Sequence, residues 1–186
     1  MSRELEELQQ KASCIRLVAL DMDGTLTDGS INIGADGELF KRFNAKDGLG
    51  ITSARRHGLI IAVITGRKGP IVQRRAEELG IAEDVMSGIS AKNQAILLLA
   101  EKHGLSMEEI AFMGDDLNDL PALLTVGLSA APGDAAEDVK QRVDYITPHN
   151  GGQGAVRDLL ELILKAKGIW QTIVEEYCDE GKEDRQ

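Results

Sequence analysis

Apolar residues in this chain occur in short runs, separated by longer segments with helical spacing. The runs at residues 15–20, 59–65 and 110–114 are apolar along most of their length, rather than at every second position. Such runs are typical of strands that are buried on both faces of a parallel sheet. Weaker runs predict three more strands, at residues 84–86, 126–130 and 144–147.

The segments between these runs predict helices. Their apolar spacing indicates helices at residues 1–12, 48–57, 70–79, 91–103, 117–124 and 135–142, and a last one from residue 154. Strands that alternate with helices in this way form a parallel sheet covered on both faces. The sequence therefore predicts an α/β fold of the doubly wound, three-layer type.

One segment breaks the alternation directly after the first strand. Residues 28–44, "DGSINIGADGELFKRFN", predict a β-hairpin with a glycine-containing turn, because apolar residues flank "GADG" on both sides. Those apolar residues are Ile31, Ile33, Leu39, Phe40 and Phe43. A hairpin of this kind is marginally stable alone in water. We therefore expect it to be buried against another subunit; a surface hairpin without a role is the alternative.

The composition agrees with one domain of moderate size. The chain has 186 residues, of which 42% are hydrophobic, which is enough for one domain with a real core. We divide it into a polar helix at residues 1–13, the main domain at residues 14–167 and a tail at residues 168–186. The formal net charge of −10 argues against nucleic acid or an anionic membrane as the main partner, because both attract basic surfaces.

The cysteines and the N-terminal segment bear on location. Cys14 and Cys178 are the only two cysteines, and they form neither a disulfide framework nor a metal-binding spacing. Residues 1–13 carry charges where a signal peptide needs an apolar core, and no run approaches the roughly 20 apolar residues of a membrane span. We expect a soluble protein of the reducing cytoplasm.

Polar side chains follow the predicted strands at one end of the sheet. Ligands of open parallel sheets bind outside the carboxyl ends of the strands, so side chains delivered there converge on one rim. The residues expected at this rim are Asp21 and Asp23 after the first strand, Thr65, Gly66 and Arg67 after the second, Lys92 at the start of a helix, and Asp115, Asp116 and Asp119 after "IAFMG". A site built from distant parts of the chain is therefore expected there.

The acidic residues at this rim need compensating positive charge. Two carboxylates about 4 Å apart repel each other by roughly 4 kcal/mol at an effective dielectric constant of about 20. Mg²⁺ prefers oxygen ligands and is typically held by one or two carboxylates together with substrate phosphate. We predict a Mg²⁺ site formed by Asp21, Asp23 and Asp115, and leave open whether Asp116 or Asp119 is a direct ligand.

The same positions suggest phosphoryl transfer. Asp21 is the candidate nucleophile, which would attack phosphorus and form an aspartyl-phosphate. Asp23 is the candidate acid that protonates the leaving alkoxide and then the base that activates water. Thr65 would donate a hydrogen bond to a phosphoryl oxygen, and Lys92 would neutralise charge on the transferring group.

The motifs that carry these residues resemble a known superfamily. "DMDGT", "ITGR", "SAKNQ" and "GDDLND" resemble, in this order, the four motifs of the haloacid dehalogenase superfamily of Mg²⁺-dependent phosphotransferases. From about residue 15 to residue 165, segments such as "TLTDG", "FNAKDGLGI" and "GGQGAVRDLLELIL" are similar to the 3-deoxy-D-manno-octulosonate 8-phosphate phosphatase family. The resemblance implies an enzyme without a mobile cap domain that hydrolyses a small phosphorylated sugar acid. It also implies a homotetramer in which the hairpins form a central barrel and a neighbour helps to close each active site.

The resemblance also implies a set of substrate-binding residues. These are Asn44, Asp47, Gly48, Gly66, Arg67 and Arg75. An arginine at position 67 has a plain rationale, because a guanidinium group binds a carboxylate through two parallel hydrogen bonds. For Arg75, an exposed helix arginine without a role in binding is the alternative.

The glycine-rich loop departs from the family pattern. The family usually carries an arginine inside this loop and a basic residue before it, whereas this chain has Gln153 and His149. Release of phosphate from nonulosonate 9-phosphates of the sialic acid type is therefore the alternative activity on the same scaffold. The related phosphatase that acts on nonulosonate 9-phosphates has a glutamate at the position of Arg67. The arginine in this chain therefore favours the octulosonate as the substrate. We expect His149 to be a hydrogen-bonding residue of the loop rather than a catalyst.

Two other classes of protein remain as alternatives. A receiver domain also combines a small doubly wound fold with Mg²⁺ and an aspartyl-phosphate, but its acidic pair and its phosphorylated residue lie on strands in the opposite order. A catalytically silent assembly domain is the second alternative, and the intact "DMDGT" argues against it. A phosphatase releases phosphate catalytically, a receiver domain does so about once, and a silent domain does not, so an assay of phosphate release distinguishes the three classes.

Overall fold

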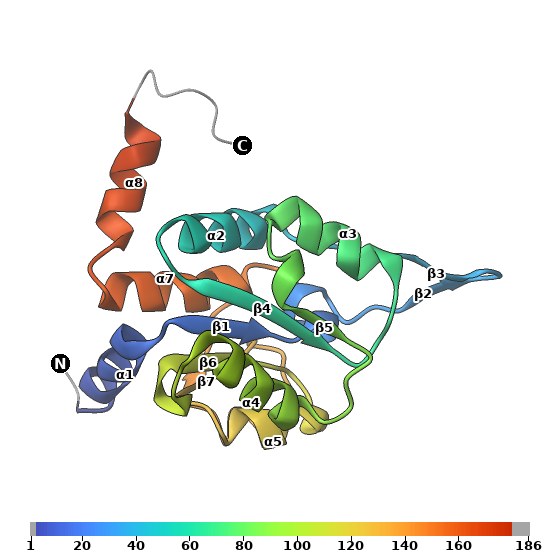
Figure 1. Cartoon of the computed structure of the whole chain (residues 1–186), viewed down its shortest axis with the longest axis horizontal. Helices are drawn as coiled ribbons and strands as arrows, with labels where there is room; N and C mark the ends of the chain where they lie inside the picture. Colours follow the sequence, from blue (N-terminus) through green and yellow to red (C-terminus); the bar gives the residue numbers. More distant parts are fainter. Residues whose placement is uncertain (1–2, 180–186) are drawn as a thin grey trace.

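The central sheet has six strands in the order β5-β4-β1-β6-β7-β8, and every neighbouring pair is parallel (Figure 1). The computed structural model describes residues 3–179. The strands are β1 (Leu17–Leu20), β4 (Ile60–Thr65), β5 (Val85–Ser87), β6 (Ile110–Met113), β7 (Leu128–Ala131) and β8 (Tyr145–Ile146). This arrangement confirms the predicted doubly wound α/β fold.

Helices cover both faces of the sheet. The layers consist of α2 (Ala45–Arg56), α3 (Pro70–Leu79) and α7 (Ala155–Ala166) on one face, and α4 (Lys92–His103), α5 (Leu120–Leu123) and α6 (Glu137–Lys140) on the other. In the central strand β1, Val18 and Leu20 are buried in the first layer's core. Leu17 and Ala19 are buried in the second. Because both faces are covered, the strand is apolar at every position.

Two helix boundaries differ from the expected ones because polar side chains cap the chain. Asn44 Oδ1 accepts a hydrogen bond from Lys46 N at 2.8 Å, so α2 begins directly after Asn44 and earlier than predicted. The predicted helix at residues 117–124 is divided, because Asp116 caps a short 3₁₀ turn that precedes α5. Within residues 3–179, no helix combines the length and the apolar character that crossing a bilayer requires.

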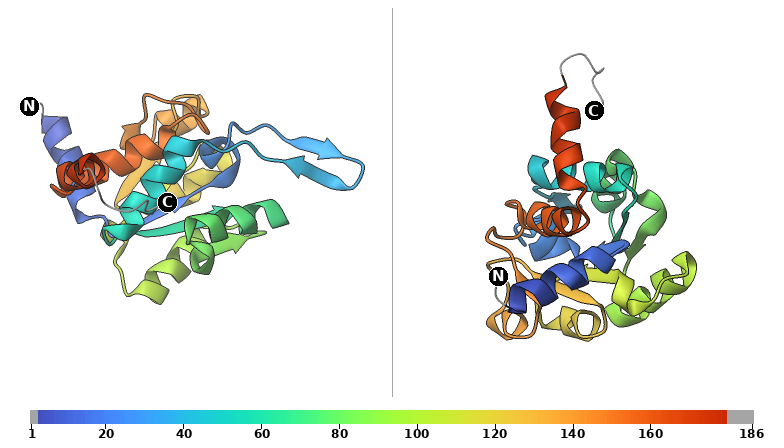
Figure 2. Two further views of the ribbon diagram at one scale, coloured as in Figure 1. Left: turned by 90° about the horizontal axis from the view of Figure 1, so that it is seen from above. Right: turned by 90° about the vertical axis from the view of Figure 1, so that its left-hand side faces the viewer.

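The predicted C-terminal tail contains a helix that the sequence pattern did not reveal. This helix, α8 (Trp170–Cys178), follows α7 and buries Ile173 in the first core. Helix α1 (Arg3–Cys14) occupies the N-terminal segment, and both α1 and α8 lie at the end of the molecule opposite the hairpin (Figures 1 and 2). Outside the described residues lie the outermost parts of the two terminal segments, residues 1–2 and 180–186.

The predicted hairpin is present and stands apart from the layers. β2 (Asn32–Gly34) and β3 (Gly37–Phe40) pair antiparallel and extend beyond the carboxyl end of β1 (Figure 2). Ile33 and Leu39 are 71% and 65% exposed. Within one chain, the hairpin therefore presents apolar side chains to solvent.

Asp144 connects three parts of the fold. Its Oδ2 accepts hydrogen bonds from Ser129 N at 2.9 Å and Ser129 Oγ at 3.0 Å, and its Oδ1 lies 2.5 Å from Lys11 Nζ of α1. Burial alone would raise the pKa of Asp144, but the Lys11 ammonium and the Ser129 donors hold it below its ordinary value. Folding therefore stabilises the charged form of this carboxylate.

We expect Asp144→Ala to lower the free energy of unfolding by about 1–3 kcal/mol, because it removes a charged acceptor from three donors. Since the folded pKa is the lower one, this contribution is complete above the ordinary pKa of 3.8 and disappears as the pH falls through the folded value. Urea unfolding at neutral and acidic pH measures the effect. Asp138→Ala, at an exposed carboxylate of α6, is the control and should change stability by less than about 0.5 kcal/mol. Equal stability of wild type and Asp144→Ala at neutral pH would contradict the prediction.

Candidate active site

A lysine and two carboxylates form a buried cluster at the carboxyl end of the sheet. Asp21 follows β1, and Lys92 begins α4. Lys92 Nζ lies 2.7 Å from Asp21 Oδ1 and 2.5 Å from Asp119 Oδ1, and all three residues are buried. Burial alone would lower the pKa of Lys92, but the two carboxylates raise it above its ordinary value. The ammonium group therefore stays charged at neutral pH.

A third carboxylate, that of Asp115, lies beside this cluster. One carboxylate oxygen from each of Asp21, Asp115 and Asp119 lies within 4.8 Å of the others. Burial, followed by repulsion from Asp119, raises the pKa of Asp21 to about 6. Burial, followed by repulsion from Asp21 and Asp119, raises the pKa of Asp115 to about 8. One lysine charge does not compensate three carboxylates, and their oxygen atoms fit a hard divalent cation such as Mg²⁺.

Asp119 also shapes the loop that carries Asp115. Its Oδ2 accepts hydrogen bonds from the backbone N–H groups of Asp115 at 3.0 Å and Asp116 at 3.3 Å. A Cβ on Gly114 would lie 2.5 Å from the Asp119 carboxylate carbon, so only glycine fits there. The exposed Asp116 carboxylate instead accepts from Leu117 N at 2.8 Å. Of the two residues that the sequence left open, Asp119 is the one that faces the cluster.

Two residues of "DMDGT" hold Asp115 in place, and the sequence pattern assigned neither of them to the site. A Cβ on Gly24, which has a φ of +91°, would lie 2.0 Å from Asp115 Oδ2. Thr25 is fully buried, and its hydroxyl group donates to Asp115 Oδ1 at 3.4 Å. The available signal was the glycine and threonine directly after the two aspartates.

Asp23 does not belong to this group of three carboxylates and has cationic partners instead. Its Oδ1 contacts Lys41 Nζ, and its Oδ2 lies 3.5 Å from Arg67 Nε. The expected metal-binding set of Asp21, Asp23 and Asp115 therefore stays a prediction; among residues 3–179, the carboxylate oxygens that lie close together are those of Asp21, Asp115 and Asp119. The two cationic partners of Asp23 come from the end of the hairpin and from the turn after β4. Lys41 was not predicted, and its only signal was its place in a basic part of the chain.

The turn after β4 lies at the predicted rim. Thr65 is buried at the end of β4, and its Oγ1 accepts a hydrogen bond from Arg67 N at 3.2 Å. The Arg67 side chain is about half exposed. A Cβ on Gly66 would make only an ordinary contact, 3.6 Å from Ile89 O, so shape alone does not demand glycine there. Contacts of these residues with a substrate stay a prediction.

The other four residues expected to bind substrate lie between helices. Asp47 is buried, and its Oδ1 accepts from Arg157 N in the first turn of α7 at 2.8 Å. Asn44 caps α2. Gly48 and Arg75 pack together, since a Cβ on Gly48 would lie 2.5 Å from Arg75 Nη2. Within one chain these residues contact each other and their helices, and their contact with substrate stays a prediction.

The glycine-rich loop at residues 149–154 packs against the turn after β1. Gly152 N donates to Thr25 O at 3.0 Å. The His149 ring forms a hydrogen bond with Asp158 at 2.8 Å, measured from Nδ1 to Oδ2. His149 is thus a hydrogen-bonding residue of the loop, and the loop packs closely against Gly24 and Thr25.

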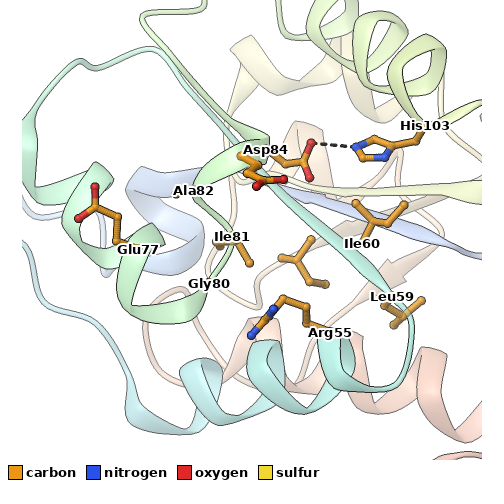
Figure 3. A pocket seen from close by; sticks show the side chains of 11 residues that line it. Arg55, Leu59, Ile60, Glu77, Gly80, Ile81, Ala82, Asp84 and His103 are labelled. Atoms are coloured by element: carbon orange, nitrogen blue, oxygen red, sulfur yellow. Dashed lines mark hydrogen bonds and ion pairs between the residues drawn. The ribbon is translucent and has the colours of Figure 1, made fainter.

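A cavity of about 450 Å³ lies at the opposite end of the sheet, where β4 begins and α3 and α4 end (Figure 3). Asp84 and His103 line it and contact each other at 2.8 Å. Arg55 and Glu77 belong to the same lining. None of the expected site residues borders this cavity, so it is separate from the candidate active site.

Known proteins match this chain in sequence. The model of the haloacid dehalogenase-like hydrolase family matches residues 77–160. The 3-deoxy-D-manno-octulosonate 8-phosphate phosphatase of Escherichia coli is 44% identical over 162 residues, which cover 87% of this chain and 86% of that protein. The phosphatase of the same name from Haemophilus influenzae is 40% identical over 161 residues, covering 87% and 89%.

Solved structures match in the same way. The 3-deoxy-D-manno-octulosonate 8-phosphate phosphatase of Moraxella catarrhalis, solved with magnesium, phosphate and the sugar acid, superimposes with a TM-score of 0.89 at 40% identity, covering 92% of this chain and 98% of that one. The cobalt-bound phosphatase of Haemophilus influenzae gives a TM-score of 0.83 at 40% identity, covering 86% and 92%. Both neighbours therefore hold a divalent metal.

We expect Mg²⁺ to raise the melting temperature of this protein, because the cation would relieve the repulsion among Asp21, Asp115 and Asp119. The rise should be larger at about pH 8.5 than at about pH 5.5, because protons on the two carboxylates of raised pKa compete with the metal at lower pH. Thermal unfolding with Mg²⁺ and with a chelator measures both effects.

A pair of variants at neighbouring positions tests where Mg²⁺ binds. Asp115→Asn should lose most of the Mg²⁺-induced rise, whereas Asp116→Asn, a matched change at an exposed carboxylate, should keep it. An equal rise in the two variants would show that Mg²⁺ binds elsewhere.

Proposed function

This chain belongs to the haloacid dehalogenase-like hydrolases and, among them, to the 3-deoxy-D-manno-octulosonate 8-phosphate phosphatases, and from that premise we propose its reaction. The proposed enzyme is a Mg²⁺-dependent phosphomonoester hydrolase that releases phosphate from 3-deoxy-D-manno-octulosonate 8-phosphate. The observation that carries the proposal is the group of Asp21, Asp115 and Asp119 at the carboxyl end of the sheet, in which the buried Lys92 contacts Asp21 and Asp119.

The proposed reaction has two steps, each carried by residues of this chain. Mg²⁺ held by Asp21 and Asp115 would neutralise charge and orient the phosphoryl group. In the first step, an Asp21 oxygen forms a bond to phosphorus while the bond to the sugar oxygen breaks, and Asp23 gives that oxygen a proton. In the second, Asp23 takes a proton from the water that attacks phosphorus, which releases phosphate and restores Asp21. Lys92 holds Asp21 in place, and Thr65 would donate its hydroxyl proton to a phosphoryl oxygen.

The substrate assignment rests on the relatives and on one side chain of the rim. The matched phosphatases carry the octulosonate substrate in their names. Arg67 presents a half-exposed guanidinium group that suits a sugar-acid carboxylate. A nonulosonate 9-phosphate of the sialic acid type is the second candidate, because Gln153 leaves the loop beside the site without the usual arginine.

We also propose that the protein is cytoplasmic and that neither nucleic acid nor a membrane is its partner. The two cysteines are free, as suits a reducing cytoplasm. The acidic net charge argues against binding to nucleic acid or to an anionic membrane surface.

Assays of phosphate release test the proposed reaction. With Mg²⁺, we expect turnover of the octulosonate 8-phosphate to exceed that of a nonulosonate 9-phosphate and of simple hexose phosphates. Asp21→Asn should lower turnover at least about 10³-fold, because it removes the nucleophile. Asp138→Asn, at an exposed carboxylate far along the chain, should keep wild-type turnover. Activity that persists in Asp21→Asn, or in excess chelator, would contradict the mechanism.

We propose that the hairpins of four chains bury one another in a homotetramer. The hairpin carries four exposed apolar side chains, those of Ile31, Ile33, Leu39 and Phe40. Figure 2 shows that its ribbon projects from the layers, with no helix of the described residues lying over it. Burying this area would supply the stability that an isolated hairpin lacks.

Light scattering tests the assembly. We expect a tetramer for the wild type and smaller species for Leu39→Asp, because a buried charge in the hairpin contact is costly. Leu124→Asp is a matched control, since Leu124 is 66% exposed and Leu39 is 65% exposed. A wild-type monomer, or equal effects of the two variants, would rule out the hairpin contact.

A further inference from the structure

Lys41 is buried at the base of the hairpin, although lysine side chains are rarely buried in proteins. The residue follows directly after β3, and its side chain is only 1% exposed. Its Nζ contacts Asp23 Oδ1 and lies 2.7 Å from Glu38 Oε1. Glu38 Oε1 receives no well-aligned hydrogen bond from the described residues, so the lysine charge is what compensates it.

A buried charge of this kind calls for a reason other than stability. Taking ions out of water is costly, and well-packed apolar residues often stabilise a fold equally well. Burial would lower the pKa of Lys41, but Asp23 and Glu38 raise it, so the lysine stays charged. A charged lysine between two carboxylates holds both of them in position. Here Lys41 holds the Oδ1 atom of Asp23.

The contacts form a chain of charges across three segments. On one side of Asp23, Arg67 Nε from the turn after β4 lies 3.5 Å from Oδ2. On the other side, Lys41 leads to Glu38, which belongs to β3 and pairs with Ile33 across the hairpin. The orientation of the Asp23 carboxylate is therefore held by one cation from the sheet edge and one from the hairpin base.

From these contacts we propose that Lys41 is a positioning residue for Asp23, which it holds in the orientation for proton transfer and ties to the hairpin through Glu38. The inference rests on the proposed function, in which Asp23 exchanges a proton with the sugar oxygen and then with water. It gives the hairpin a part in the chemistry in addition to its part in assembly, because Glu38 is a hairpin residue.

Steady-state phosphate release by the full-length protein with Mg²⁺ tests this role. Lys41→Met keeps the length of the side chain and removes its charge. We expect kcat to fall about 10- to 100-fold and KM to change less than about 3-fold, because proton transfer is impaired while substrate binding is not. Lys41→Arg, which keeps the charge, should recover part of the lost kcat. Arg42→Met is the matched control and should keep wild-type kcat, because Arg42 is exposed and its ion pair within residues 3–179 is with Asp28 at 3.3 Å.

A double-mutant cycle separates positioning from a general effect on folding. If Lys41 acts through Asp23, then Lys41→Met should lower kcat less than about 3-fold in an Asp23→Asn background. Equal losses in both backgrounds would overturn the inference, and so would wild-type kcat in Lys41→Met. If circular dichroism shows that Lys41→Met does not fold, Glu38→Gln takes its place in the same cycle, with an expected fall in kcat of about 3- to 10-fold.

The activity of the wild type distinguishes failure of the proposed function from failure of the role of Lys41. If the wild type releases no phosphate from the octulosonate 8-phosphate or from para-nitrophenyl phosphate, the proposed function fails and the role of Lys41 fails with it. If the wild type is active and Lys41→Met leaves kcat unchanged, only the role of Lys41 fails.

Discussion

The carboxyl edge of the sheet depends on the position of Lys92 between Asp21 and Asp119. Three carboxylates meet at this edge in a largely water-excluded place, and Lys92 is the buried cation that contacts two of them. The fold brings it there by starting α4 at Lys92, after a short strand at the edge of the sheet. The remaining negative charge is what makes the site receptive to a divalent metal.

The rest of the edge is shaped so that these groups can approach one another. Glycines stand where backbone or carboxylate comes too close for a side chain: at Gly24 against Asp115, at Gly114 against Asp119 and at Gly151 against the carbonyl oxygen of Gly24. Strand β1, buried on both faces, supplies a rigid platform for Asp21. Close packing of this kind holds reacting groups in a fixed geometry, which is where much of the rate of a positioned reaction comes from.

Asp21 and Asp23 illustrate how neighbouring residues in one motif separate in space. Asp21 belongs to the group of three carboxylates and Lys92, whereas Asp23 lies among Lys41, Arg67 and, through Lys41, Glu38. In the proposed reaction, the first group supplies the nucleophile and the second holds the carboxylate that exchanges protons. The hairpin contributes Glu38 to the second group, so side chains connect the hairpin with the candidate site.

The sequence by itself determined the parallel sheet, the hairpin and most of the rim, because each follows from local patterns: apolar runs, a glycine turn, and polar residues directly after strands. It did not reveal α8, whose place depends on burying Ile173 against a core formed elsewhere. Only the tertiary structure decided that Asp119 and not Asp23 joins the carboxylate group, and that Asp47 turns toward α7. The physical reason is that these outcomes depend on the direction of side chains and on partners far apart in the chain, which no local pattern encodes.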